Sequence, residues 1–245
     1  MKIAALFISL LLFAGAAEAR QPDMIQFEDG EPVAMQDGYA YLLIRENVAV
    51  NFVFVRALGA DEWKAIADEF KQDRDYRPPS NVVEIMGRDS YAKAGDERTY
   101  VLAVKPGTYI LGEQSFGYNG ACLCMGSVKF EAKAGVVTDL GTLLFANNDR
   151  PTTIPELANI VQQKVLSDDL PWIAMALRPA TETTPDPLKG LPRVLADYHA
   201  VNKFPNYFGA FADRLAPVPG ILGYDAEGNV LDLRTGGPAD SVVPH

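Results

Sequence analysis

The chain contains few of the side chains on which most catalytic and metal sites depend. Among its 245 residues there are two histidines, His199 and His245, and two cysteines, Cys122 and Cys124. A zinc site built on histidine, or a serine-histidine-aspartate relay, has almost no material here. We therefore predict no catalytic residue and no cofactor, and an enzyme is the less favoured class.

Basic patches are also missing. Lysine and arginine together number 22, against 32 aspartates and glutamates, so the formal net charge is −10 at pH 7. An acidic chain without a basic cluster is a poor partner for phosphate backbones and anionic lipids. Nucleic acid is excluded as a partner. No glycine-rich phosphate loop or dinucleotide fingerprint is present either.

Long hydrophobic runs are confined to the N-terminus. Lys2 precedes an apolar run over residues 3–14, and Ala17-Glu-Ala19 supplies the small residues that a signal peptidase needs. The run is shorter than the roughly 20 apolar residues that cross a bilayer. We expect residues 1–19 to be a signal peptide cleaved after Ala19. The product is then periplasmic or secreted, with no membrane insertion.

Most of what remains has the composition of strands and turns. With 17 prolines and 20 glycines, the exported chain favours β structure. Residues 39–46 and 50–58 are rich in aromatic and β-branched residues and could pair across the short link between them. Residues 98–116 predict a hairpin turned at Pro106-Gly107, and residues 127–145 repeat the pattern around Gly135.

One helix is expected between these strands, over residues 61–73. Asp61 can cap its N-terminus. An apolar face recurs at helical spacing, formed by Trp63, Ile66, Ala67 and Phe70. We interpret Trp63 as packing on the edge of a sheet rather than as a platform for a ligand.

Two stretches carry a resemblance to a known fold. Arg-Thr-Tyr-Val-Leu-Ala-Val-Lys-Pro-Gly-Thr-Tyr-Ile-Leu, followed by Val-Lys-Phe-Glu-Ala-Lys-Ala-Gly-Val-Val-Thr-Asp-Leu-Gly, resembles small β-sandwich domains of uncharacterised exported bacterial envelope proteins. Those are similar to the carboxypeptidase regulatory-like, or prealbumin-like, sandwiches. The resemblance covers residues 35–147 and implies a mainly β, antiparallel β-sandwich over residues 23–147. It transfers no catalytic motif.

After Asn147 the sequence becomes rich in loops. Thr153 and Glu156 have the spacing of a capping box for a helix that continues to Val165. A strand is expected over residues 171–179, a long loop over 180–192, and a hairpin over 221–233 turned at Glu227-Gly-Asn229. We expect residues 148–245 to form a loop-rich α+β region that packs on the sandwich.

Isolated candidates for chemistry are weak. His199, beside Asp197 and Tyr198, could act as a general base, but no nucleophile is visible near it in the sequence. Ser115 lies in Gly-x-x-Ser-x-Gly, which is not the spacing of a nucleophile elbow. Several tail aromatics could line a groove, although core packing is the favoured interpretation: Tyr198, Phe204, Tyr207, Phe208 and Phe211.

The cysteine pair leaves three interpretations open. Residues two apart in a straight strand lie about 6.6 Å apart, near the long end of the usual range for bonded cysteines, so a disulfide between Cys122 and Cys124 needs a kinked backbone. Two thiolates with Met125 nearby are also soft ligands of the kind that hold copper(I). Alternatively, both thiols are simply buried in the core. The exported context favours the disulfide.

These observations lead to one predicted function and one alternative. The chain is predicted to be an exported, non-enzymatic structural or binding β-sandwich protein of the bacterial envelope, whose partner is an unidentified envelope protein or glycan. The alternative is a periplasmic thiol-redox or copper-handling protein that uses Cys122 and Cys124, with Met125 as the third copper ligand.

Overall fold

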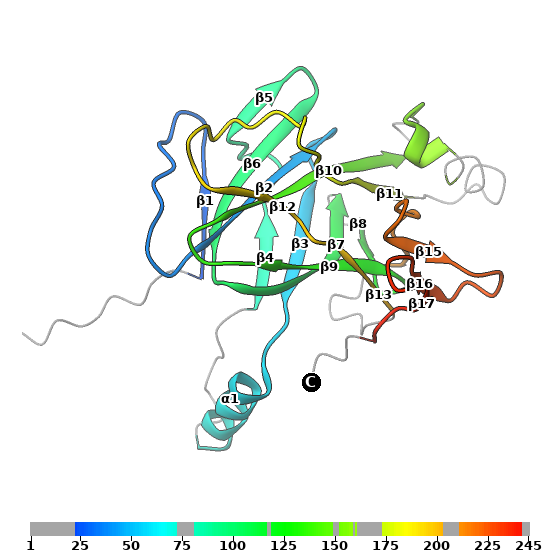
Figure 1. The fold of residues 1–245 in the computed structure, drawn as a ribbon, viewed down its shortest axis with the longest axis horizontal. Helices are drawn as coiled ribbons and strands as arrows, with labels where there is room; N and C mark the ends of the chain where they lie inside the picture. The colour runs from blue at the N-terminus through cyan, green and yellow to red at the C-terminus, as the bar shows by residue number, and fades with distance from the viewer. Residues whose placement is uncertain are drawn as a thin grey trace, which may run out of the picture.

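The protein is built from two seven-stranded sheets that pack face to face, with a third, three-stranded sheet at one end (Figure 1). The structure is a computed structural model, and it describes residues 23–72, 81–116, 119–148, 152–158, 160, 173–202 and 211–241. The main core lies between the two large sheets and contains side chains from both. The predicted mainly β, antiparallel sandwich is confirmed.

The first large sheet, sheet A, has the central order β1-β6-β2-β10-β11, with β5 beside β6 and β12 beside β10. Its strands are β1 (Met24–Phe27), β2 (Ala40–Glu46), β5 (Ala92–Ala94), β6 (Glu97–Val104), β10 (Val137–Asn147), β11 (Ile173–Arg178) and β12 (Arg193–Leu195). Most pairs are antiparallel, but β10 runs parallel to both β2 and β12. Every residue of β2 and β10 is buried, because loops cover the outer face of the sheet.

The second large sheet, sheet B, has the order β13-β9-β7-β3-β4, extended by β8 on β7 and by β14 on β8. Its strands are β3 (Asn51–Arg56), β4 (Val82–Ile85), β7 (Gly107–Phe116), β8 (Asn119–Cys122), β9 (Ser127–Ala132), β13 (His199–Val201) and β14 (Phe211–Ala212). Aromatic rings on its inner face stack and meet edge to face, as in the pair of Phe54 on β3 and Phe130 on β9, whose centroids are 5.8 Å apart.

Three predicted strand pairings are wrong, and all three fail in the same way. Residues 39–46 and 50–58 form β2 and β3, which lie in different sheets. The segments joined at Pro106-Gly107 are β6 and β7, and those joined around Gly135 are β9 and β10, again in different sheets. The turn residues set where the chain reverses, but here each reversal carries it across the sandwich instead of along one sheet.

The helix α1 (Ala60–Gln72) forms where the sequence predicts it, and it extends away from both large sheets (Figure 1). Asp61 does not cap it, because the helix begins one residue earlier. Instead the Glu62 carboxylate reaches back to accept a hydrogen bond from Gly59 N at 3.1 Å. Ala67 is exposed, and the side chains of Trp63, Ile66 and Phe70 lie outside the described residues.

The predicted capping box at Thr153 and Glu156 does not form. Residues 155–158 are helical, but the Glu156 carboxylate binds the Arg178 guanidinium at 2.6 and 3.0 Å. A nearby threonine, Thr152, accepts a hydrogen bond from Ile154 N. The rest of the expected helix, including Val161 and Val165, lies outside the described residues.

The C-terminal region is woven into both large sheets. β11 and β12 pair with β10 in sheet A, while β13 and β14 pair with β9 and β8 in sheet B. The predicted hairpin of residues 221–233 is confirmed as β15 (Leu222–Tyr224) and β16 (Val230–Asp232), which together with β17 (Gly237–Pro238) form the third sheet. Residues 148–245 therefore share main-chain hydrogen bonds with the predicted domain of residues 23–147.

Two sequence predictions concern the membrane. Residues 1–19, the expected signal peptide, lie outside the described residues. Within the described part of the chain, no helix has both the length and the apolar character needed to cross a bilayer.

Candidate functional site

The two cysteines lie in a tight turn at the end of β8. Cys122 ends the strand, and the turn closes with a hydrogen bond of 3.3 Å from Gly126 N to Leu123 O. This kink brings the two cysteine Cα atoms to 5.2 Å, well inside the usual range of about 4.4–6.8 Å. In the structure the sulfurs are bonded to each other, and Cys122 and Cys124 are 1% and 5% exposed. A bond in the isolated protein stays a prediction.

The C-terminal region holds this turn in place. Asp213 N donates to Cys122 O at 2.8 Å, and Asp213 O accepts from Met125 N at 3.0 Å. Gly126 has φ of +147°, and a Cβ there would lie 2.7 Å from Tyr224 Oη. That hydroxyl donates to Leu215 O at 2.6 Å. The turn is thus clamped between β8 and the chain around residues 213–224.

A buried carboxyl group faces the same turn. Glu113 on β7 is the direct partner of Cys122 on β8. Leu123 N donates to Gly112 O at 2.8 Å, so the neighbouring pair is the hydrogen-bonded one, and Glu113 and Cys122 form the closer, non-hydrogen-bonded kind. Such residues share one face of the sheet, with Cβ atoms about 4.5–5.5 Å apart.

The environment of Glu113 favours its protonated form. The residue is 8% exposed, and its buried Oε2 atom has no hydrogen-bond partner. Burial raises the pKa of this carboxyl, and the negative charge of Glu84 on β4 raises it further. The arrangement places a carboxyl with a raised pKa directly opposite Cys122 on the neighbouring strand.

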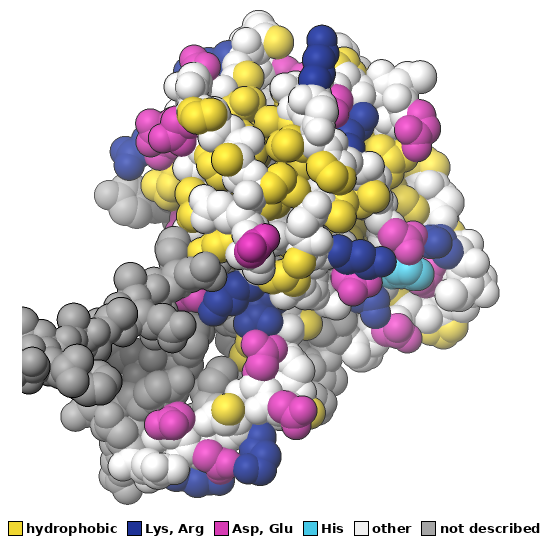
Figure 2. Space-filling view, turned by 60° about the vertical axis from the view of Figure 1, so that its left-hand side comes forward, with side chains coloured by type: hydrophobic (Ala, Val, Ile, Leu, Met, Phe, Trp, Pro, Cys, Tyr) yellow, Lys and Arg dark blue, Asp and Glu magenta, His cyan; other side chains and the backbone are white. Residues whose placement is uncertain are grey.

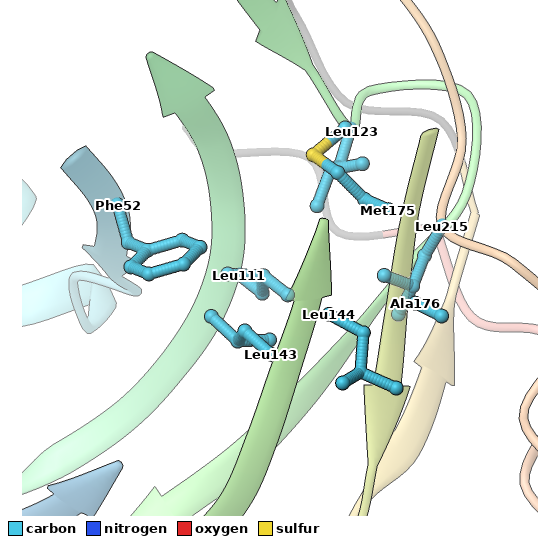
Figure 3. Close-up of a pocket in the computed structure, with 8 residues that line it drawn as sticks. All are labelled: Phe52, Leu111, Leu123, Leu143, Leu144, Met175, Ala176 and Leu215. Atoms are coloured by element: carbon cyan, nitrogen blue, oxygen red, sulfur yellow. The ribbon is translucent and has the colours of Figure 1, made fainter. Parts of the chain in front are cut away.

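A small cavity lies in the core beside Leu123, the residue between the cysteines. It measures about 10 Å³, the lower limit for a single water molecule. Figure 3 shows the apolar side chains around it, which come from both large sheets, the turn after β8 and the loop before β15: Phe52, Leu111, Leu123, Leu143, Leu144, Met175, Ala176 and Leu215. A cavity this small and apolar stays dry and holds no ligand.

Apolar side chains also cover the outer face of sheet A. Loops close over a second core there, formed by Phe27, Tyr39, Tyr41, Leu43, Val101, Ala103, Val137 and Leu188. Side chains packed around it are only half-buried: Ile25, Val33, Met35, Tyr91 and Leu191. We call these five residues the sheet A patch. In Figure 2, which brings this side of the molecule forward, apolar side chains gather over the upper part of the surface.

His199, the candidate general base, lies on β13 in a charged cluster. Its Nδ1 atom is 3.5 Å from Asp232 and its Nε2 atom is 3.8 Å from Asp197, while the Arg234 guanidinium is 3.3 Å from Nε2. Arg234 also binds Asp197 and the carbonyl of Tyr198. Among the described residues, these ring neighbours are carboxylates and a guanidinium and include no nucleophile. The cluster ties β13 to β16.

The other candidate residues from the sequence are Ser115 and the tail aromatics. Ser115 is part of β7, with its side chain outside the described residues. Tyr198 is 3% exposed and meets the Phe130 ring edge to face, so it is a core residue. The other tail aromatics lie outside the described residues or have undescribed side chains. No group of three or more histidine, cysteine or acidic side chains in the described chain could hold a metal ion.

A buried ion cluster on sheet A was not predicted. Asp139 is fully buried, and its carboxylate accepts hydrogen bonds from the guanidinium groups of Arg45 and Arg193 and from Gly141 N. Arg45 also donates to Pro185 O at 2.5 Å. Since Pro185 and Arg193 belong to the loop after β11 and the strand that follows it, the cluster fastens this loop onto the sheet.

A second buried acid is the last residue of β2, next to Arg45 in the chain. Glu46 is fully buried, and its carboxyl contacts Tyr100 Oη, which also donates to Gly87 O at 2.8 Å. Val50 N lies 3.5 Å from Oε2. Burial raises the pKa of Glu46 to about 8, against smaller lowering effects from Tyr100, Val50 and Arg98.

Sequence reasoning missed Glu113, Asp139 and Glu46 as special residues. Each one is an acid in a segment whose apolar residues predict a strand, and that is the signal that could have singled them out. A hydrogen bond joins Asp139 to Arg45, 94 positions away in the chain, and Glu46 to Tyr100, 54 positions away. Strand register pairs Glu113 with Cys122, 9 positions away. No spacing rule connects such residues.

Comparison with known proteins gives no further guide. No protein-family model, no curated protein and no solved structure matches this chain.

Proposed function

We propose that the chain is an exported, non-enzymatic β-sandwich protein of the bacterial envelope that acts as a structural or binding module. The observation that carries this proposal is the sheet A patch. Partly exposed aliphatic side chains gathered on one face are typical of a surface that another protein covers. Among envelope partners, the patch favours a protein over a glycan, because four of its five residues are aliphatic.

The test is a pair of charge substitutions. Replacing Val33 and Met35 with glutamate puts two carboxylates into the patch, which should abolish cross-linking to a partner in intact cells. The control is Leu233→Glu, because Leu233 is an exposed leucine (44%) outside the patch. We expect the same cross-linked product from the wild type and the control and none from the patch variant. A product that survives the patch substitutions would contradict binding through this surface.

A second candidate is a thiol-redox protein, and the cysteine turn specifically favours it. The turn places Cys122 and Cys124 at bonding distance and sets a buried carboxyl across from Cys122. In a redox protein, this pair would exchange electrons with a dithiol partner. The copper-handling variant needs two free thiolates instead, with Met125 as a neighbouring soft ligand.

Whether Cys122 and Cys124 are bonded or free distinguishes the thiol-redox function from the copper-handling function. For a disulfide, we expect protein from the periplasm to show no free thiol after denaturation, and two after reduction. Replacing both cysteines with serine should lower the free energy of unfolding by only about 1–2 kcal/mol, because so small a ring removes little loop entropy. Thiol titration and urea unfolding measure both quantities. Copper handling predicts two free thiols and copper(I) uptake that the double variant loses.

A further inference from the structure

Glu113 and the cysteine pair belong together chemically. The carboxyl is nine-tenths buried and has an oxygen without a hydrogen-bond partner, and its strand position puts it on the same face as Cys122. Burying a carboxyl without a hydrogen-bond partner costs free energy. Such a carboxyl can act as a proton donor when a nearby group needs a proton. Breaking the Cys122–Cys124 bond creates such a group.

We propose that Glu113 donates a proton to Cys122 when the pair is reduced by a dithiol, and accepts that proton when the pair is reoxidised. The proposal rests on the redox function given above as the second candidate. It assigns the two sulfurs different roles, since Cys124 lies in the turn and is 5% exposed, whereas Cys122 ends β8 and is 1% exposed. The partner attacks Cys124, and Cys122 leaves.

Reduction proceeds in two thiol–disulfide exchanges. A partner dithiol loses one proton to water, and its thiolate bonds to Cys124 Sγ, while the bond between the two protein sulfurs breaks and its electron pair stays on Cys122 Sγ. Glu113 gives its proton to that thiolate and becomes a carboxylate. The second partner thiol, after losing its proton, displaces Cys124, which takes a proton from water. The partner ends as a disulfide, and the protein holds two thiols.

The groups around Glu113 suit this role. On its side of sheet B, β3 presents Val53 as its direct partner, β8 presents Cys122, and β4 presents Glu84 one strand further out. Glu84 is the charged group that acts on Glu113, and like burial it favours the protonated carboxyl. Burial and Glu84 thus both favour the protonated form of Glu113, on the strand directly opposite the sulfur that leaves.

The test measures how dithiothreitol reduces the native protein as a function of pH. The rate is divided by the fraction of dithiothreitol present as thiolate. For the wild type, we expect this corrected rate to fall as pH rises through the pKa of Glu113. For Glu113→Gln it should be flat and lower by about 10-fold, less than the usual ~10²–10⁴ for proton donors, because a thiolate already leaves well. Circular dichroism checks that the variant folds.

Two further variants make the result specific. Glu84→Gln removes the neighbouring negative charge and should move the wild-type midpoint to lower pH. Glu131→Gln changes an exposed carboxylate on β9, elsewhere in the same sheet, and should leave the midpoint unchanged. A merely structural role for Glu113 would not predict the shift with Glu84→Gln.

The outcomes distinguish the proposal from the function on which it rests. If Glu113→Gln has the wild-type rate and pH profile, or if Glu84→Gln does not move the midpoint, Glu113 is not the proton donor, although the pair is redox-active. If dithiothreitol releases two thiols from denatured protein but none from native wild type, the redox function fails and the proposal with it. Free thiols in the protein as isolated overturn both.

Discussion

Replacing Asp139 with asparagine is expected to lower the free energy of unfolding by about 3–5 kcal/mol, the usual effect of breaking a buried ion pair. Asp139 is fully buried, and Arg45, one of its two partners, is only 4% exposed. Asparagine keeps the size of the side chain but removes its charge, so both guanidinium groups lose their counter-ion. Urea unfolding, monitored by circular dichroism, gives the change in stability.

The control is the surface pair of Arg56 and Glu62, where the Glu62 side chain is 47% exposed. Glu62→Gln should cost about 0–1 kcal/mol, because water solvates both groups when the pair is broken. Limited proteolysis adds a local readout, since the loop through Pro185 should be cut faster in Asp139→Asn. An Asp139→Asn variant as stable as the Glu62→Gln control would show that the cluster does not fasten the loop.

The second large effect is a loss of stability as pH rises from 4.5 to about 8, caused by Glu46. With a pKa of about 8 in the folded protein and 4.5 when unfolded, Glu46 binds a proton in the fold between these values but not in the unfolded chain. Stability from this group is complete below pH 4.5 and is lost as pH rises to about 8. The loss is on the order of 5 kcal/mol, at up to about 1.4 kcal/mol per pH unit.

The hydrogen bonds around Glu46 explain the direction. Tyr100 has one hydroxyl hydrogen and two acceptors, Glu46 and Gly87 O. A protonated Glu46 donates to Tyr100, which is then free to donate to Gly87. An ionised Glu46 competes with Gly87 O for that hydrogen and also carries a buried charge, which the charge of Arg98, its partner on β6, offsets only in part.

The matched variant is Glu46→Gln, whose amide donates to Tyr100 at every pH. We expect it to be about as stable as the wild type near pH 5 and more stable by several kcal/mol at pH 9. Because the raised pKa of Glu113 acts in the same direction in both proteins, the difference between them isolates Glu46. Equal pH dependence of unfolding in the two proteins would refute the assignment.

The positions of the strands were accessible from the sequence because they depend on local properties. Aromatic and β-branched runs located β2, β3, β6, β7 and β11, and the turn at Glu227-Gly-Asn229 located the hairpin of β15 and β16. The cysteine spacing also indicated that a bond requires a kinked backbone. The turn after Cys122 supplies that kink. These conclusions need only the preferences of neighbouring residues.

Which strands pair was decided by the tertiary structure alone. The reversals at Pro106-Gly107 and Gly135 look the same in sequence whether the chain returns along one sheet or crosses to the other. Only the folded protein distinguishes these two paths of the chain. There β2 and β10 are buried on both faces at the centre of sheet A, a position that requires a partner strand on each side.

The chemistry of the candidate sites was decided at the same level. The sequence shows Glu46, Glu113 and Asp139 as three acids among 32, and their ordinary role would be as solvated surface charges. Strand register places Glu113 opposite Cys122, and sheet packing places Asp139 between two arginines and Glu46 against Tyr100. Burial then determines which acids keep their protons and which require a counter-ion, because the cost of a charge depends on its surroundings and not on its neighbours in sequence.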